Sequence, residues 1–184
     1  MANSADKTKP YFHPTGLVTD GYSRDGEATA TCFCGKVQLA FPTEAPGFVN
    51  SFVCHCSDCH KIHSSMLGAN ITIRDSHLKH IRGRELLKTF GLSKHIASGE
   101  KMTNHFCSEC GTLMYRVGEH FPGVSILRLG TVDDFNLAET KLRPTTEHFT
   151  KNRVGWLSEL KGVKHFEGPG YDVKNRLNLE KGNL

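Results

Sequence analysis

The chain has 184 residues, of which 38% are hydrophobic and 23% are charged, and its mean hydropathy is −0.38. This composition is typical of a soluble globular protein and excludes a disordered chain, and no apolar run approaches the roughly 20 residues that span a bilayer. The formal charge of +4 comes from lysines and arginines that are scattered along the chain, so neither nucleic acid nor a membrane is an expected partner.

The elements in chain order predict a mainly β protein. Residues 1–26 are polar and contain several prolines and glycines, which is typical of an irregular N-terminal arm. From residue 27 the chain changes to short alternating or β-branched runs that end at Gly, Pro, Asn or Asp. The runs expected to form strands are residues 36–41, 67–73, 86–92, 112–118 and 124–132.

Helices are expected to be few and short. Residues 57–65 predict a short helix that is capped by Ser57 or Asp58, and residues 133–140 predict another. In the segment after Pro144, we expect four apolar side chains to pack back on the sheet and cover apolar surface: Phe149, Trp156, Leu157 and Leu160.

We therefore divide the chain into three parts. An N-terminal arm covers residues 1–26, a single zinc-binding domain covers residues 27–160, and a C-terminal tail covers residues 161–184. The start of the chain has no apolar segment like that of a signal peptide, so we expect a cytoplasmic protein.

Seven cysteines are the most informative part of the composition. An odd number argues against a disulfide framework, because the cytosol keeps thiols reduced and one thiol would be left over. The cysteines are grouped closely, which burial as small apolar residues does not explain, so metal binding is the better interpretation. They form three groups: Cys32 and Cys34; Cys54, Cys56 and Cys59; Cys107 and Cys110.

The grouping suggests how two zinc ions would divide the thiolates. A structural zinc site takes four protein ligands, whereas a catalytic one takes three and keeps one position open. The first and last groups share a local design, since each is followed by a glycine, Gly35 or Gly111, that permits a tight turn. Joining them would crosslink the early and late strands, a structural task. The middle group then remains as a triplet with three ligands.

The fourth position of the triplet is open to two interpretations. A histidine could close the site, and the candidates are His55, His60, His63 and His105. Alternatively water or substrate fills the position, and the zinc can then polarise a carbonyl, activate water or bind a substrate thiolate. A nearby histidine or Asp58 could move protons in that case.

Four stretches, in this order, carry a family resemblance: "CFCGKVQLAF", "CHCSDCHKIHSS", "NHFCSECGTLMY" and "LRLGTVDD". They resemble the glutathione-dependent formaldehyde-activating enzymes, a family that includes centromere protein V. The resemblance implies a β-tent fold of small twisted antiparallel sheets with two zinc ions. It also implies the condensation of glutathione with formaldehyde to S-(hydroxymethyl)glutathione.

The resemblance also implies roles for individual residues. The structural zinc falls on the first and last groups, which are Cys32, Cys34, Cys107 and Cys110. The catalytic zinc falls on Cys54, Cys56 and Cys59. The family often has arginine or glutamine where this chain has His60, and we include His60 among the candidate catalytic residues.

Three functions are consistent with these features. The first is a zinc-dependent carbon–sulfur lyase that acts on a thiol–carbonyl adduct, because a zinc bound by three thiolates favours soft thiol chemistry. The second is a zinc lyase, dehydratase or isomerase that acts on a larger carbonyl compound. The third is a non-catalytic, zinc-stabilised module that binds protein or nucleic acid.

The expected partner is a small thiol or carbonyl compound, with glutathione as one candidate. A basic side chain would hold the carboxylates of glutathione, and the candidates are Arg74, Lys61, Lys94, Lys101 and Arg116. Exposed strand edges could pair with those of a second copy, so the oligomeric state stays undetermined by the sequence.

Overall fold

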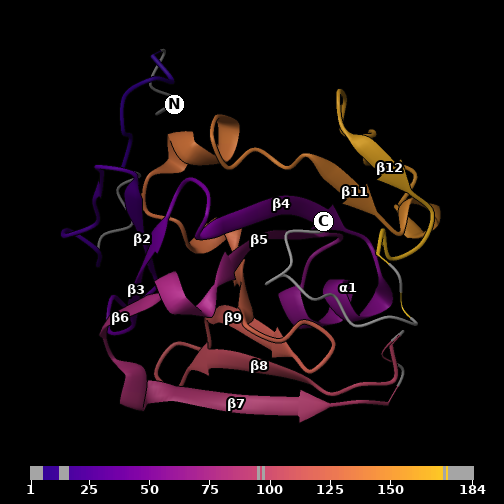
Figure 1. The fold of residues 1–184 in the computed structure, drawn as a ribbon, viewed down its shortest axis with the longest axis horizontal. Coiled ribbons are helices and arrows are strands. Elements are labelled where there is room, and N and C mark those ends of the chain that lie inside the picture. Colours follow the sequence, from indigo (N-terminus) through magenta and orange to yellow (C-terminus); the bar gives the residue numbers. More distant parts are fainter. Residues whose placement is uncertain (1–5, 13–16, 95, 97, 172, 174–184) are drawn as a thin grey trace.

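The computed structural model describes residues 6–12, 17–94, 96, 98–171 and 173. The prediction of a mainly β protein is confirmed, because the described residues form two twisted sheets, the helix α1 (Ser57–His63) and several short 3₁₀ turns. Figure 1 shows the smaller sheet at the left, β11 and β12 at the upper right, and β7 along the lower edge. Among the helices in the described residues, none has the length and apolar character needed to cross a bilayer.

The smaller sheet has four antiparallel strands in the order β1-β2-β3-β6. Their bounds are Ser23–Arg24, Glu27–Thr31, Gln38–Pro42 and Lys79–Arg82. Val37, Leu39 and Phe41 are buried in the main core as their alternation predicts, and the intervening Gln38 and Ala40 are buried as well, so this strand is covered on both faces.

The larger sheet has eight strands in the order β12-β11-β4-β5-β10-β9-β8-β7. Neighbouring strands are antiparallel except that β11 runs parallel to both β4 and β12. In sheet order, the bounds are Lys164–Phe166, Thr146–His148, Phe48–Cys54, Gly68–Arg74, Val124–Arg128, Leu113–Gly118, Met102–Cys107 and Leu87–Leu92.

The larger sheet carries a different apolar cluster on each face. On one face, Ile71 and Leu127 pack with Leu39 of the smaller sheet in the main core. On the other face, Phe52 and Ile126 form a smaller cluster with cysteines of the triplet. Because successive residues of a strand point to opposite faces, Ile126 and Leu127 belong to different clusters.

The predicted elements are present with shifted limits. Each predicted strand overlaps an observed one, but the run at 124–132 leaves the sheet after Arg128 and continues as the 3₁₀ turn Leu129–Thr131. The segment predicted as a helix at 133–140 forms the 3₁₀ helix Phe135–Glu139, begun by a hydrogen bond from the Asn136 amide to Asp134 Oδ1 (3.2 Å). In the described residues, seven strands have no predicted counterpart: β1, β2, β4, β6, β8, β11 and β12. In β4 and β8, polar residues interrupt the apolar alternation.

Described segments toward both ends of the chain pack on the sheets. The Tyr11 amide donates to Asp134 Oδ1 (2.9 Å), so this part of the arm lies against the 3₁₀ helix. Near the other end, Phe149 packs against the smaller cluster as expected. The expectation for Trp156 is wrong, since 74% of its surface is exposed. Residues 174–184 of the predicted tail lie outside the described residues.

Candidate metal centres

The first and last cysteine groups form two knuckles of similar geometry. The Gly35 amide donates to Cys32 O (2.9 Å), and the Gly111 amide donates to Cys107 O (2.8 Å). Both glycines have positive φ, 77° and 73°, a conformation that costs other residues energy. At Gly35 a side chain would also approach the Leu17 carbonyl oxygen to 2.9 Å. The two glycines therefore allow the tight turns that the sequence predicted.

The two knuckles bring four sulfurs together. Every pair of Sγ atoms in this four-cysteine cluster lies within 4.8 Å. Cys34 Sγ is 3.5 Å from Cys32 Sγ and 3.8 Å from Cys107 Sγ. A tetrahedral zinc with Zn–S bonds of about 2.3 Å separates its sulfurs by about 3.8 Å, so the cluster fits one zinc ion. Burial raises the pKa of the Cys32 thiol to about 12, so its thiolate needs a cation nearby.

The triplet is built where β4 leads into α1. Cys54 ends β4, Cys56 precedes the helix, and Cys59 lies in its first turn, so one short loop brings three Sγ atoms within 4.8 Å of one another. The predicted caps, Ser57 and Asp58, are wrong. Cys56 is the N-cap, and its sulfur accepts a hydrogen bond from the Cys59 amide (3.4 Å).

Among the described residues, no histidine or carboxylate joins the triplet as a fourth ligand. His55 is buried, and its Nε2 lies 2.7 Å from Glu147 Oε1. His105 stacks on Tyr115 with ring centroids 4.3 Å apart. His60 and His63 each have a buried Nε2 atom without a hydrogen-bond partner. The interpretation in which a histidine closes the site is therefore not supported by the geometry.

Glu147, which the sequence analysis missed, fixes the loop that carries the triplet. Its carboxylate is buried and accepts two hydrogen bonds of 3.0 Å from Arg153 Nη1 and one from His55. Burial acts to raise the pKa of Glu147, but the hydrogen bonds from His55 and Arg153 outweigh it and hold the pKa below its ordinary value. Because His55 lies between Cys54 and Cys56, this contact holds the loop in place.

Two arginines make the surroundings of the triplet positive. Burial acts to lower the pKa of Arg116, but the charges of the three cysteines outweigh it and raise the pKa. Burial and the neighbouring charge of Arg116 lower the pKa of Arg128 to about 9, which leaves Arg128 protonated at neutral pH. Of the basic residues that the sequence analysis proposed, Arg116 thus lies near the triplet. Lys61, Lys94 and Lys101 are exposed, and Arg74 Nε donates to Pro46 O (2.9 Å).

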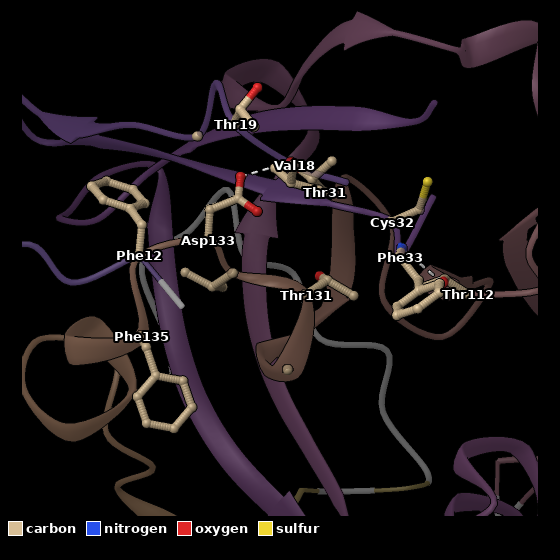
Figure 2. A pocket seen from close by; sticks show the side chains of 13 residues that line it. Phe12, Val18, Thr19, Thr31, Cys32, Phe33, Thr112, Thr131, Asp133 and Phe135 are labelled. Atoms are coloured by element: carbon tan, nitrogen blue, oxygen red, sulfur yellow. Dashed lines mark hydrogen bonds between the residues drawn. The ribbon is translucent and has the colours of Figure 1, made fainter. Parts of the chain in front are cut away.

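A cavity of about 350 Å³ lies beside the four-cysteine cluster and not beside the triplet. Figure 2 shows Cys32 and Phe33 at one end of this cavity and Phe12 and Phe135 toward the other. Asp133 accepts a hydrogen bond from Thr31 Oγ1 (2.6 Å) in its wall. The cavity therefore borders the four-cysteine cluster.

Of the comparisons with known proteins, the family model identifies the family. A crystal structure of a Rhodobacter sphaeroides protein is similar to this chain, with 22% identity and a TM-score of 0.47 over 60% of this chain and 93% of that one. No curated protein matches the chain. The family model described as "Glutathione-dependent formaldehyde-activating enzyme" matches residues 27–152, a stretch that includes all seven cysteines. The chain therefore belongs to the glutathione-dependent formaldehyde-activating enzyme family.

Proposed function

We propose that the protein is a zinc-dependent carbon–sulfur lyase that forms and cleaves the adduct of a thiol and a carbonyl compound, with glutathione and formaldehyde as the first pair to test. The observation that carries this proposal is the triplet, in which three thiols converge and no fourth protein ligand joins them among the described residues. Membership of the family supports the same reaction. A zinc ion held by these thiolates would supply a soft Lewis acid that lowers the pKa of a bound thiol.

Side chains around the triplet have separate tasks in this proposal. Phe52, Ile126 and Phe149 form an apolar wall beside the sulfurs, which limits water and strengthens electrostatic interactions there. Glu147 holds His55, so the loop keeps its shape while substrate binds and leaves.

The reaction needs one proton transfer. The thiol sulfur forms a bond to the carbonyl carbon, and the proton that leaves the sulfur ends on the carbonyl oxygen, so the adduct contains every atom of the two substrates. We assign this transfer to His60, whose buried Nε2 has no hydrogen-bond partner in the protein. The reverse reaction returns the proton to the sulfur.

NMR exchange spectroscopy tests the proposal directly. Glutathione and formaldehyde exchange with their adduct without an enzyme, so the protein must increase the exchange rate above that background. We expect the wild-type protein with two zinc ions to increase the rate and Cys56→Ser not to increase it. If the wild-type protein, shown by native mass spectrometry to contain both ions, leaves the rate at background, the formaldehyde reaction is excluded.

A further inference from the structure

Two arginines lie on the face of the larger sheet that carries the triplet. Arg128 of β10 pairs with Asn70 of β5, which in turn pairs with Phe52 of β4. Arg116 of β9 pairs with Ile126 of β10. Paired residues in antiparallel strands share a face, and so do residues two apart in one strand. Both guanidinium groups are therefore on the same side as the apolar wall of the triplet.

Arg128 is almost completely buried but has few partners. It is 4% exposed, and its Nη1 donates to Asn70 Oδ1. Its Nε and Nη2 atoms are buried without a hydrogen-bond partner, and so is Nε of Arg116. Within the part of the chain that the structure describes, neither arginine forms an ion pair with an aspartate or glutamate.

An unpaired buried cation is costly, so this arrangement indicates an anion that is not part of the protein. Thiolates of the triplet balance part of the charge, since they raise the pKa of Arg116. They do not account for the orientation of Arg128. Nε and Nη2 lie on one edge of the planar guanidinium and donate in parallel, which matches the two oxygens of a carboxylate and not a single sulfur.

We propose that Arg128, assisted by Arg116, forms a carboxylate-binding subsite beside the triplet, and that the site therefore selects thiols that carry a carboxylate. This inference rests on the proposed function, because it assigns the substrate class of the same site. Arg116 is partly exposed, whereas Arg128 is buried. Glutathione has the required chemistry, as do smaller carboxylated thiols.

A pair of small thiols of almost equal shape tests the selection. We would titrate the zinc-loaded wild-type protein with 3-mercaptopropionate and with 3-mercaptopropionamide by calorimetry. The carboxylate should bind about tenfold more tightly or better, the effect of one charge-assisted hydrogen bond. Equal affinities for the two thiols would overturn the proposal without the need for any variant.

Variants then locate the subsite. In Arg128→Gln the preference for the carboxylate should disappear, whereas Arg128→Lys should keep part of it because the charge remains without the parallel donors. Arg116→Gln should reduce the preference. The control is Arg84→Gln, which removes an exposed arginine and should leave the preference unchanged. If Arg128→Gln weakens the binding of both thiols equally, the arginine acts on the sulfur alone and the subsite is absent.

Folding and zinc content are measured for each variant by thermal unfolding and native mass spectrometry. If Arg128→Gln does not fold, the wild-type preference and Arg116→Gln still decide the matter. The outcome is separate from that of the formaldehyde assay. A protein that prefers the carboxylated thiol but does not accelerate exchange with formaldehyde has the subsite and acts on another carbonyl compound.

Discussion

The four-cysteine cluster and the triplet use the same ligand for different structural purposes. In the four-cysteine cluster, Cys34 and Cys107 are 73 residues apart, and their sulfurs lie 3.8 Å from each other. The triplet instead lies within one loop between β4 and α1. A metal at the four-cysteine cluster therefore joins distant parts of the chain, whereas a metal at the triplet joins residues that are already neighbours.

The surroundings of the four-cysteine cluster and of the triplet also differ. Cys32 and Cys107 belong to the main core, where apolar residues of both sheets meet. Cys54 and Cys59 lie in the smaller cluster on the other face, close to Arg116 and Arg128. Loss of a ligand should thus affect folding at the four-cysteine cluster and chemistry at the triplet. This assignment would be disproved if loss of a triplet ligand impaired folding while loss of a ligand in the four-cysteine cluster impaired only the chemistry.

Cys110→Ser should have the largest effect on stability. Binding of a structural zinc contributes directly to folding, so loss of one ligand should lower the free energy of unfolding by about 4 kcal/mol or more. For a protein of this length, that corresponds to a fall in Tm of about 10 °C. Calorimetry measures the shift. A Cys110→Ser protein that melts like the wild type would show that the four-cysteine cluster is not structural.

Glu147→Gln should have the next largest effect, at about 3 kcal/mol, because it removes the charge of a buried carboxylate and leaves the partly buried Arg153 without its charge partner. Denaturant unfolding measures the loss. We expect the triplet to bind zinc less well and its loop to change conformation, whereas the four-cysteine cluster should keep its zinc. The matched control is Glu159→Gln, an exposed carboxylate near the same segment, which should be neutral.

The effect of Glu147→Gln should depend on pH in a defined direction. The pKa of Glu147 is held below its ordinary value, so its contribution is fully present above the unfolded-state pKa of about 4.3. That contribution disappears as the pH falls through the lowered pKa of the folded state. The stability difference between wild type and variant should thus be constant above about pH 5.5 and shrink below about pH 4. A difference that grows on acidification would contradict this assignment.

Cys56→Ser should lower the free energy of unfolding less than Cys110→Ser or Glu147→Gln does. Serine is itself a good N-cap, so α1 keeps its first hydrogen bond, and we expect a loss of about 1 kcal/mol. Native mass spectrometry should show one zinc ion, and exchange of the glutathione–formaldehyde adduct should fall to background. If Cys56→Ser unfolds as readily as Cys110→Ser, the triplet is as structural as the four-cysteine cluster.

Each of the three cysteine groups could be recognised from the sequence because its members lie close together in the chain. Spacing of the cysteines and the glycines at 35 and 111 indicated which thiols could converge. Glu147 and Arg128 could not be found in this way, since their roles arise from pairing between strands distant in sequence. Glu147 pairs with Val53 across β11 and β4. A charged residue in a short strand looks exposed until the register is known.

Local rules also failed where another requirement was stronger. Ser57 and Asp58 are better N-cap residues than cysteine, yet the helix begins after Cys56, which places three sulfurs together. A general preference for burying aromatic residues likewise suggested that Trp156 covers the sheet. The neighbouring segment instead reaches the domain through Arg153 and through the Leu160 amide, which donates to Glu147 Oε2 (3.4 Å).

Trp156→Ala should consequently have the smallest effect of the four substitutions. Its indole is 74% exposed, so truncation removes little buried apolar surface and should change the free energy of unfolding by less than about 0.5 kcal/mol. Denaturant unfolding monitored by circular dichroism suits the measurement, because the variant lacks the tryptophan that fluorescence would report. Both zinc ions and the rate of adduct exchange should be retained. A loss as large as that of Glu147→Gln would mean that the segment after β11 is held to the sheet by the indole and not by the buried carboxylate.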